Sequence, residues 1–146
     1  MISFEEELER SGTLVFPNKG TSMMPLLRQN RDLMVIEKKG PGRCKKYDAI
    51  LFKRGSSYVL HRILRVREQD YYVVGDNCRR GEYVRDEQIL GVLTQVVRDG
   101  KTIRPEDPAY RLYIHLWCDA FPLRQGLFYA RDKVRSAGNR VKKLLK

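Results

Sequence analysis

Short apolar runs separated by turn-forming residues fill the first two thirds of the chain, and most of them end at Gly, Asp, Asn or Pro. Runs rich in aliphatic, β-branched and aromatic residues are typical of β-strands. Asp99-Gly100 adds a strong hairpin signal. The pattern therefore predicts a mainly β body, a coiled sheet or partly closed barrel. Its expected strands are Leu14–Phe16, Leu33–Glu37, Ala49–Lys53, Tyr58–Val66, Tyr71–Val74 and Ile89–Val97.

The two ends of the chain have a helical pattern instead. Residues 2–10 favour a short helix. After Pro105 and Pro108, apolar positions recur at three- and four-residue steps, which is the period of one helix face. The sequence thus predicts a β domain over residues 1–105, with a short N-terminal helix, and a helical basic extension over residues 106–146. The apolar stripe of that extension comprises Leu123, Leu127, Ala130, Val134, Ala137, Val141 and Leu145.

Length and cysteine usage narrow the class of protein. A chain of 146 residues that is 42% hydrophobic can bury one core. Cys44, Cys78 and Cys118 are an odd number without CxxC spacing, which argues against a disulfide framework or a zinc site and fits a reducing compartment. We expect buried or half-buried thiols, with Cys78 close to any site at the preceding turn.

The start of the chain is acidic and resembles no secretory signal, and no run reaches the roughly 20 apolar residues of a membrane span. A cytoplasmic location is expected, with a peripheral place at the inner membrane face as an extension of it. The net charge of +11 favours an anionic partner. Nucleic acid is disfavoured, because no helix-turn-helix, RNP-like or zinc motif accompanies the charge.

The basic tail allows two interpretations. Residues 131–146 carry seven basic side chains and the single acid Asp132. Basic amphipathic helices bind anionic membrane surfaces. Alternatively, the apolar stripe packs on the β body or on a partner, and the basic side chains are only solvated.

Three short segments supply the residue types of an activated-serine hydrolase. Ser22 lies in a glycine-marked turn, His61 in an apolar run and Asp76 in a Gly-Asp-Asn turn. A serine hydroxyl needs a neighbouring base, and imidazole has a pKa near neutrality, whereas the guanidinium of Arg62 stays protonated. A carboxylate best orients the imidazole. Asp76 is preferred for this role because it follows directly on the Tyr-Tyr-Val-Val strand.

Other assignments remain open at these positions. Glu82 and Asp86 are alternatives to Asp76 as the third group. Ser22 and Asp76 can also be plain turn residues, without any catalytic role. His115, the other of the two histidines, is expected to be a structural helix residue packed among aromatic side chains.

The order of the motifs from residue 12 to residue 97 resembles the serine peptidases of the type I signal peptidase and LexA-type repressor superfamily. The similarity is greatest to the endoplasmic-reticulum and sporulation branch, whose members use serine and histidine. The motifs are Ser22-Met23-Met24-Pro25, Tyr47-Asp48-Ala49-Ile50, His61-Arg62-Ile63, Gly75-Asp76-Asn77 and Ile89-Leu90-Gly91-Val92.

The resemblance implies a site and an activity. Ser22 would be the nucleophile and His61 the general base, with Asp76 beside them, in a coiled, partly closed β-barrel-like body without metal or organic cofactor. The substrate would be a leader or precursor peptide with small residues before the cut. The implied function is that of a serine endopeptidase acting through an acyl-enzyme; the alternative is a catalytically silent binding or regulatory module.

Two departures from the family pattern affect details of the site. Many bacterial signal peptidases have a hydroxyl residue two positions before the nucleophile, where this chain has Gly20. The oxyanion would then be bound by the backbone N–H groups of Ser22 and Met23, as in the repressor branch. Basic residues also interrupt the acidic cluster after Gly-Asp-Asn, which leaves the identity of the third group open. They are Arg79, Arg80 and Arg85.

Overall fold

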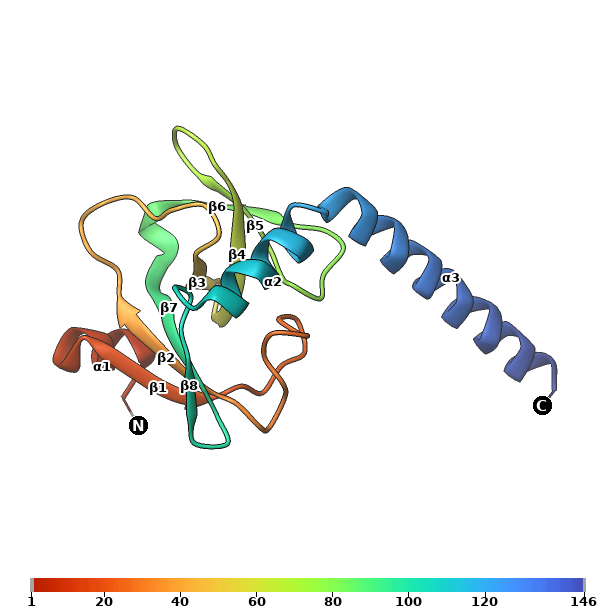
Figure 1. The fold of residues 1–146 in the computed structure, drawn as a ribbon, viewed down its shortest axis with the longest axis horizontal. Coiled ribbons are helices and arrows are strands. Elements are labelled where there is room, and N and C mark those ends of the chain that lie inside the picture. Colours follow the sequence, from red (N-terminus) through yellow and green to blue (C-terminus); the bar gives the residue numbers. More distant parts are fainter. Residues whose placement is uncertain (1, 146) are drawn as a thin grey trace.

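A computed structural model describes residues 2–145 as one antiparallel β-sheet accompanied by three α-helices (Figure 1). The helices are α1 (Phe4–Ser11), α2 (Pro108–Cys118) and α3 (Phe121–Leu144). The strands are β1 (Thr13–Pro17), β2 (Leu33–Lys38), β3 (Ala49–Arg54), β4 (Ser57–Val66), β5 (Tyr71–Val74), β6 (Glu82–Val84), β7 (Ile89–Arg98) and β8 (Lys101–Ile103).

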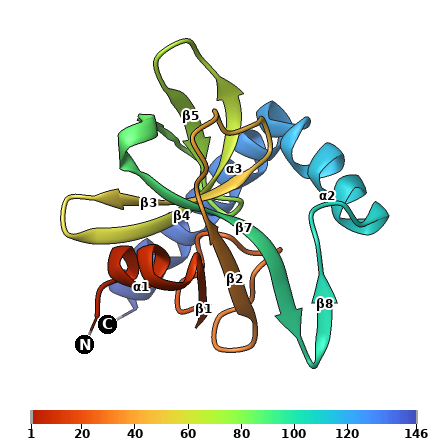
Figure 2. The same cartoon turned by 90° about the vertical axis from the view of Figure 1, so that its left-hand side faces the viewer.

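The strands form a single path in the order β1-β2-β7-β3-β4-β5-β6, and β8 pairs with β7 beside it. Figure 2 shows the strands fanning in different directions, so the sheet is strongly curled. Register shifts where β7 meets β2 and β3, and where β4 meets β5, are bulges that bend the strands. The end strands β1 and β6 do not pair, so the sheet is not closed. A mainly β fold with a C-terminal helix is confirmed at this level.

All six predicted strands are present, but the sequence analysis missed two features. β6 is only three residues long and pairs with β5 through Tyr72 and Tyr83. The C-terminal segment is two helices that separate at Asp119 and Ala120, and Pro122 lies in the first turn of the second helix. Proline suits the first helical turn, where its missing N–H group has no partner to lose. A regular apolar period does not reveal such a break.

Local signals fix the ends of several elements. Ser3 and Glu6 form a capping box at the start of α1. Gly12 ends that helix in the left-handed conformation, with a φ of 76°. Asp99 and Gly100 both have positive φ values, 52° and 77°, as the predicted two-residue hairpin between β7 and β8 requires.

The apolar core is divided among three clusters. One joins α1 and the loop after β1 to the sheet, through Leu8, Met23 and Leu27. A second is built on β3, β4 and β5 around Phe52 and Ile63. A third fixes α2 on the body, with Tyr110, Ile114 and Cys118 at its centre. The helical segment therefore begins as a packed part of the body.

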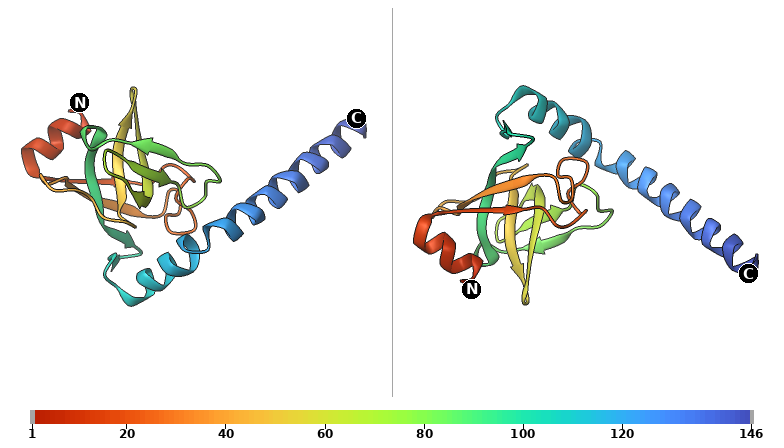
Figure 3. Two further views of the ribbon diagram at one scale, coloured as in Figure 1. Left: turned by 90° about the horizontal axis from the view of Figure 1, so that it is seen from above. Right: turned by 90° about the horizontal axis from the view of Figure 1, so that it is seen from below.

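α3 leaves the body as a long projecting helix (Figure 3). Its first turns pack inward through Arg124 and Phe128, which are buried. The apolar stripe does not pack on the β body, because Leu123, Leu127 and Val134 are 75%, 67% and 72% exposed. The predicted packing of the stripe on the β body is therefore wrong, whereas its packing on a partner stays a prediction. Between residues 2 and 145, no helix has both the length and the apolar character needed to cross a membrane.

Candidate active site

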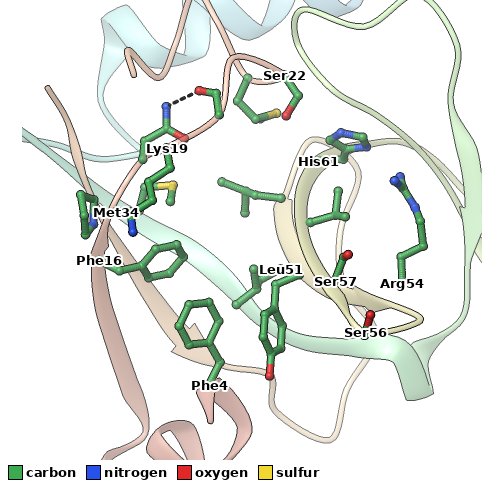
Figure 4. Close-up of a pocket in the computed structure, with 17 residues that line it drawn as sticks. Phe4, Phe16, Lys19, Ser22, Met34, Leu51, Arg54, Ser56, Ser57 and His61 are labelled. Carbon is green, nitrogen blue, oxygen red and sulfur yellow. Dashed lines mark hydrogen bonds between the residues drawn. The ribbon is translucent and has the colours of Figure 1, made fainter. Parts of the chain in front are cut away.

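Ser22 and His61 lie at the same end of a cavity of about 740 Å³. Figure 4 shows Phe4 of α1 at the opposite end. The Phe4 ring packs between Phe16 of β1 and Tyr58 of β4. Its centroid lies 4.8 Å from that of Phe16 and 4.5 Å from that of Tyr58. Apolar side chains from three strands line the middle of the cavity, among them Met34, Leu51 and Leu60. The cavity is therefore a largely apolar groove, with Ser22 and His61 among the polar residues at one end.

Ser22 lies in the long loop between β1 and β2, and the Gly-Asp-Asn turn holds its backbone. The Asn77 amide donates to the Ser22 carbonyl oxygen at 2.8 Å, and the Asn77 side chain donates to the Thr21 carbonyl at 3.1 Å. The next residue, Met23, is 2% exposed, and its sulfur accepts a weak hydrogen bond from the Asp76 amide at 3.4 Å. Two motifs whose contacting residues are 53 to 56 positions apart in the sequence thus meet at Ser22.

Asp32 holds the other end of the same loop. Its carboxylate is 1% exposed and accepts from Arg98 of β7 at 2.9 and 2.7 Å and from the Arg28 amide at 2.8 Å. The Arg98 guanidinium lowers the pKa of Asp32. Asn18 donates to the Gly20 carbonyl at 3.0 Å, two residues before Ser22. The loop is therefore fixed at both ends.

His61 comes from β4, where it pairs with Ile50 of β3. Its imidazole is 8% exposed and meets the Phe52 ring edge to face at 6.0 Å. A Cβ atom on Gly75 would lie 3.0 Å from His61 Nε2 and 2.6 Å from the Ser22 carbonyl oxygen. The imidazole and the backbone of Ser22 therefore approach each other across a position that only glycine can occupy.

Burial lowers the pKa of His61, because desolvation disfavours the imidazolium. The Glu82 carboxylate raises this pKa and the Arg54 guanidinium lowers it. His61 Nδ1 is buried without a hydrogen bond among the described residues, and Glu82 Oε1 lies 3.7 Å from it. Arg54 holds Glu82 in place at 3.0 Å. A neutral imidazole is the form that can accept a proton from a serine hydroxyl.

Asp76 does not orient His61 in this structure. Its carboxylate, 1% exposed, accepts from Arg62 at 2.9 and 3.0 Å and from the Tyr113 hydroxyl at 2.7 Å. Trp117 donates to its carbonyl oxygen at 2.7 Å. The physical reason is the charge of Arg62. This residue follows His61 in β4, but its side chain is buried and its guanidinium binds the Asp76 carboxylate. Asp76 is thus a structural brace, and its contact with the loop that carries Ser22 is made by its backbone amide.

The two alternatives for the third group lie in different surroundings. Glu82 in β6 faces His61 Nδ1, as described. Asp86 accepts from the Tyr71 hydroxyl at 2.6 Å and pairs with Arg43 at 3.3 Å and Lys39 at 3.6 Å, and these contacts include neither His61 nor Ser22. Glu82 is therefore the carboxylate best positioned to stabilise a protonated His61.

The backbone amides of Ser22 and Met23 have no hydrogen-bond acceptor among residues 2–145. Amides without an intramolecular acceptor can bind an oxyanion.

Cys78 Sγ lies 3.9 Å from the Ser22 carbonyl oxygen, so the thiol is close to the site, and burial raises the pKa of Cys78. Cys44 and Cys118 are buried, and all three thiols are free.

The sequence analysis missed the contribution of α2 to this region. Tyr113 and Trp117 bind Asp76, and Tyr110 accepts from Arg62 at 3.1 Å. The sequence shows that aromatic residues cluster in this segment. Their pattern does not indicate that they bind Asp76, about 40 residues earlier. His115 lies in α2 as expected. Its side chain is 60% exposed and bonds to Asp119, so the expected packing among aromatic side chains is reduced to an edge contact with Tyr47.

The surroundings of His61 predict an unusual titration. Because burial lowers its pKa, the His61 imidazole should titrate below about 6.5 in NMR spectra, with its signal assigned from a His61→Gln variant. Glu82→Gln should move the midpoint lower still, since it removes the carboxylate that raises the pKa. Asp86→Asn should leave the midpoint in place. A midpoint above 6.5, or equal shifts in both variants, would contradict the geometry described here.

Comparison of the sequence with protein-family models gives no match, and comparison with curated proteins gives none either. Within residues 2–145, no three His, Cys, Asp or Glu side chains are grouped as metal ligands would be. A functional interpretation of this chain therefore depends on the cavity and on the residues at its end.

Proposed function

We propose that the chain is a serine endopeptidase of the signal-peptidase-like superfamily, with Ser22 as nucleophile and His61 as general base. The observation that carries the proposal is that both residues line one end of an apolar cavity, where a Cβ atom on Gly75 would lie 3.0 Å from His61 Nε2 and 2.6 Å from the Ser22 carbonyl oxygen. The lowered pKa of His61 supports it, because a base must be neutral at the working pH. The fixed loop that carries Ser22 supports it further.

An extended peptide would fit along the cavity by pairing with strand edges. β1 pairs with β2 alone, and residues 57–61 of β4 pair with β3 alone, because pairing with β5 begins at Arg62. Each strand thus keeps one backbone edge without a strand partner. Main-chain hydrogen bonds to such edges are a common way to bind peptides, with side chains entering pockets between them.

The proposed chemistry gives each of these groups one role. His61 takes the proton of the Ser22 hydroxyl as its oxygen attacks the scissile carbonyl carbon. The Ser22 and Met23 amides stabilise the oxyanion, an effect worth about 10²–10³ in rate per donor. Collapse breaks the C–N bond, and His61 returns the proton to the leaving amine. Water then repeats the cycle on the acyl-enzyme, and Glu82 stabilises the imidazolium in both halves.

The finer features of the family belong to the same proposal. The partly closed barrel of the signal peptidase and LexA type is supported by the curled β-sheet with its C-terminal helix. A leader or precursor peptide with small residues before the cut is the substrate class that the motifs imply. A peripheral place at the inner membrane face is favoured by the net charge of +11.

One observation favours the second candidate, a silent binding or regulatory module. Asp76 is engaged with Arg62, and His61 Nδ1 has no hydrogen-bond partner within residues 2–145. The same cavity and strand edges would then bind a peptide without cutting it. Binding without cleavage is thus the outcome that distinguishes the two candidates.

The proposed catalytic dyad of Ser22 and His61 is tested with a library of peptides carrying small residues. Cleavage is followed by mass spectrometry. Ser22→Ala and His61→Ala should each lower cleavage by at least about 10³-fold, because each group is needed for nucleophilic attack. Ser136→Ala, an exposed serine on α3, is the matched control and should cut like the wild type. Unchanged cutting in either dyad variant would assign the activity to another site. Peptide binding without any cutting by the wild type would favour the silent module.

Gly75 offers a second, independent test. In Gly75→Ala, the new methyl group would lie 2.6 Å from the Ser22 carbonyl oxygen, so the nucleophile loop must move. A displacement of about 1 Å at a reacting group costs on the order of 100-fold in rate, and kcat/KM should fall by about that factor. Gly42→Ala places a methyl group in open space and is the control. Wild-type kcat/KM in a folded Gly75→Ala variant would refute the close approach.

A further inference from the structure

The face of α3 that points away from the body carries an apolar stripe. Successive residues of a helix are separated by about 100° around its axis, so side chains at steps of four and seven lie on one face. This face carries Leu123, Leu127, Val134, Val141 and Leu144, with exposed fractions between 54% and 86%. Large apolar side chains in a continuous exposed row indicate a surface that something else covers.

The opposite face of α3 is already occupied by the body. Phe128 packs on the Trp117 ring, with centroids 6.1 Å apart. Gln125 donates to the Arg79 carbonyl at 3.0 Å, and Arg131 donates to Asn77 Oδ1 at 3.3 Å. These contacts fix the rotation of the helix about its own axis, so the stripe cannot turn inward while they hold.

Basic side chains border the stripe on both sides. Arg131, Arg135 and Lys142 follow one border, and Lys133 and Arg140 follow the other. The single acid of this part, Asp132, lies on the face opposite the stripe. Long basic side chains on such borders can extend their charged ends toward an anionic layer while their methylene groups stay near apolar surface.

The basic borders disfavour a second copy of α3 as the occupant. Pairing through the stripe would place Arg131, Lys133 and Arg140 at the positions that flank a coiled-coil seam. These side chains have the same charge and neither border carries an acidic residue, so two copies would gain no salt bridge across the seam. The stripe also contains the small residues Ala130 and Ala137, which would fill such a seam poorly. An anionic surface satisfies the charges, and a second copy does not.

We propose that α3 docks on an anionic lipid surface, with its apolar stripe at the boundary of the acyl chains and its basic borders among the headgroups. The inner face of the same helix holds Asn77 and Arg79, on the loop that binds Ser22. Docking would therefore hold the Ser22 end of the cavity at a fixed place relative to the membrane. Lipid binding itself requires no catalysis, so it can fail or succeed separately from the peptidase activity.

The test is co-sedimentation of the full chain with vesicles of phosphatidylcholine, with and without about one third phosphatidylglycerol. The wild type should bind the anionic vesicles and be released by salt. Val134→Glu/Val141→Glu should weaken binding about tenfold or more, since it places charges in the stripe. Ser136→Glu/Asn139→Glu makes the same charge change away from the stripe and should weaken binding far less. Circular dichroism checks that each variant keeps its helix.

Three outcomes would overturn the proposal. The wild type could fail to bind anionic vesicles. The two double variants could lose binding equally, which would mean a purely electrostatic attraction without the stripe. Light scattering could show a wild-type dimer that Val134→Glu/Val141→Glu dissociates, which would assign the stripe to a second copy. Ser22→Ala should bind vesicles like the wild type, so a failed dyad leaves the vesicle result interpretable.

Discussion

The ion pair between Arg62 and Asp76 is the contact on which the arrangement of the site depends. Arg62 is fully buried and Asp76 is 1% exposed, so both charges have lost their water. Such a pair is tolerable only when its remaining hydrogen-bond sites are filled, and removing one partner typically costs about 3–5 kcal/mol. Here Tyr47, Tyr110 and Tyr113 fill them. The pair joins the strand that carries His61 to the turn that binds the Ser22 carbonyl.

This brace makes the C-terminal helices part of the site rather than an appendage to a β body. Tyr113 and Trp117 of α2 bind Asp76, and Gln125 and Arg131 of α3 bind the residues that follow it. The turn between β5 and β6 is thus held from three directions. The same helices expose their other faces, so a surface that binds α3 would be connected by rigid contacts to the loop that carries Ser22.

The sequence allowed prediction of the parts that depend on local pattern. Runs rich in aliphatic, β-branched and aromatic residues located six strands, and the Asp99-Gly100 signal located the hairpin after β7. The sequence did not reveal that Arg62 is the partner of Asp76. The motif order of a serine peptidase suggests His61 as that partner, but the guanidinium of the adjacent Arg62 carries a full positive charge and binds the carboxylate instead. Nor did the sequence single out Glu82, whose approach to His61 depends on the pairing of β6 with β5. Such choices depend on contacts between residues far apart in the sequence.

The most direct test of the account is the reactivity of Ser22 itself, which needs no knowledge of the substrate. The protein is treated with a fluorophosphonate, a reagent that modifies serines activated by a neighbouring base, and is analysed by intact and peptide mass spectrometry. The account predicts a single adduct on Ser22, formed much more slowly in His61→Ala. An unmodified Ser22, or the same labelling rate without the imidazole, would contradict it.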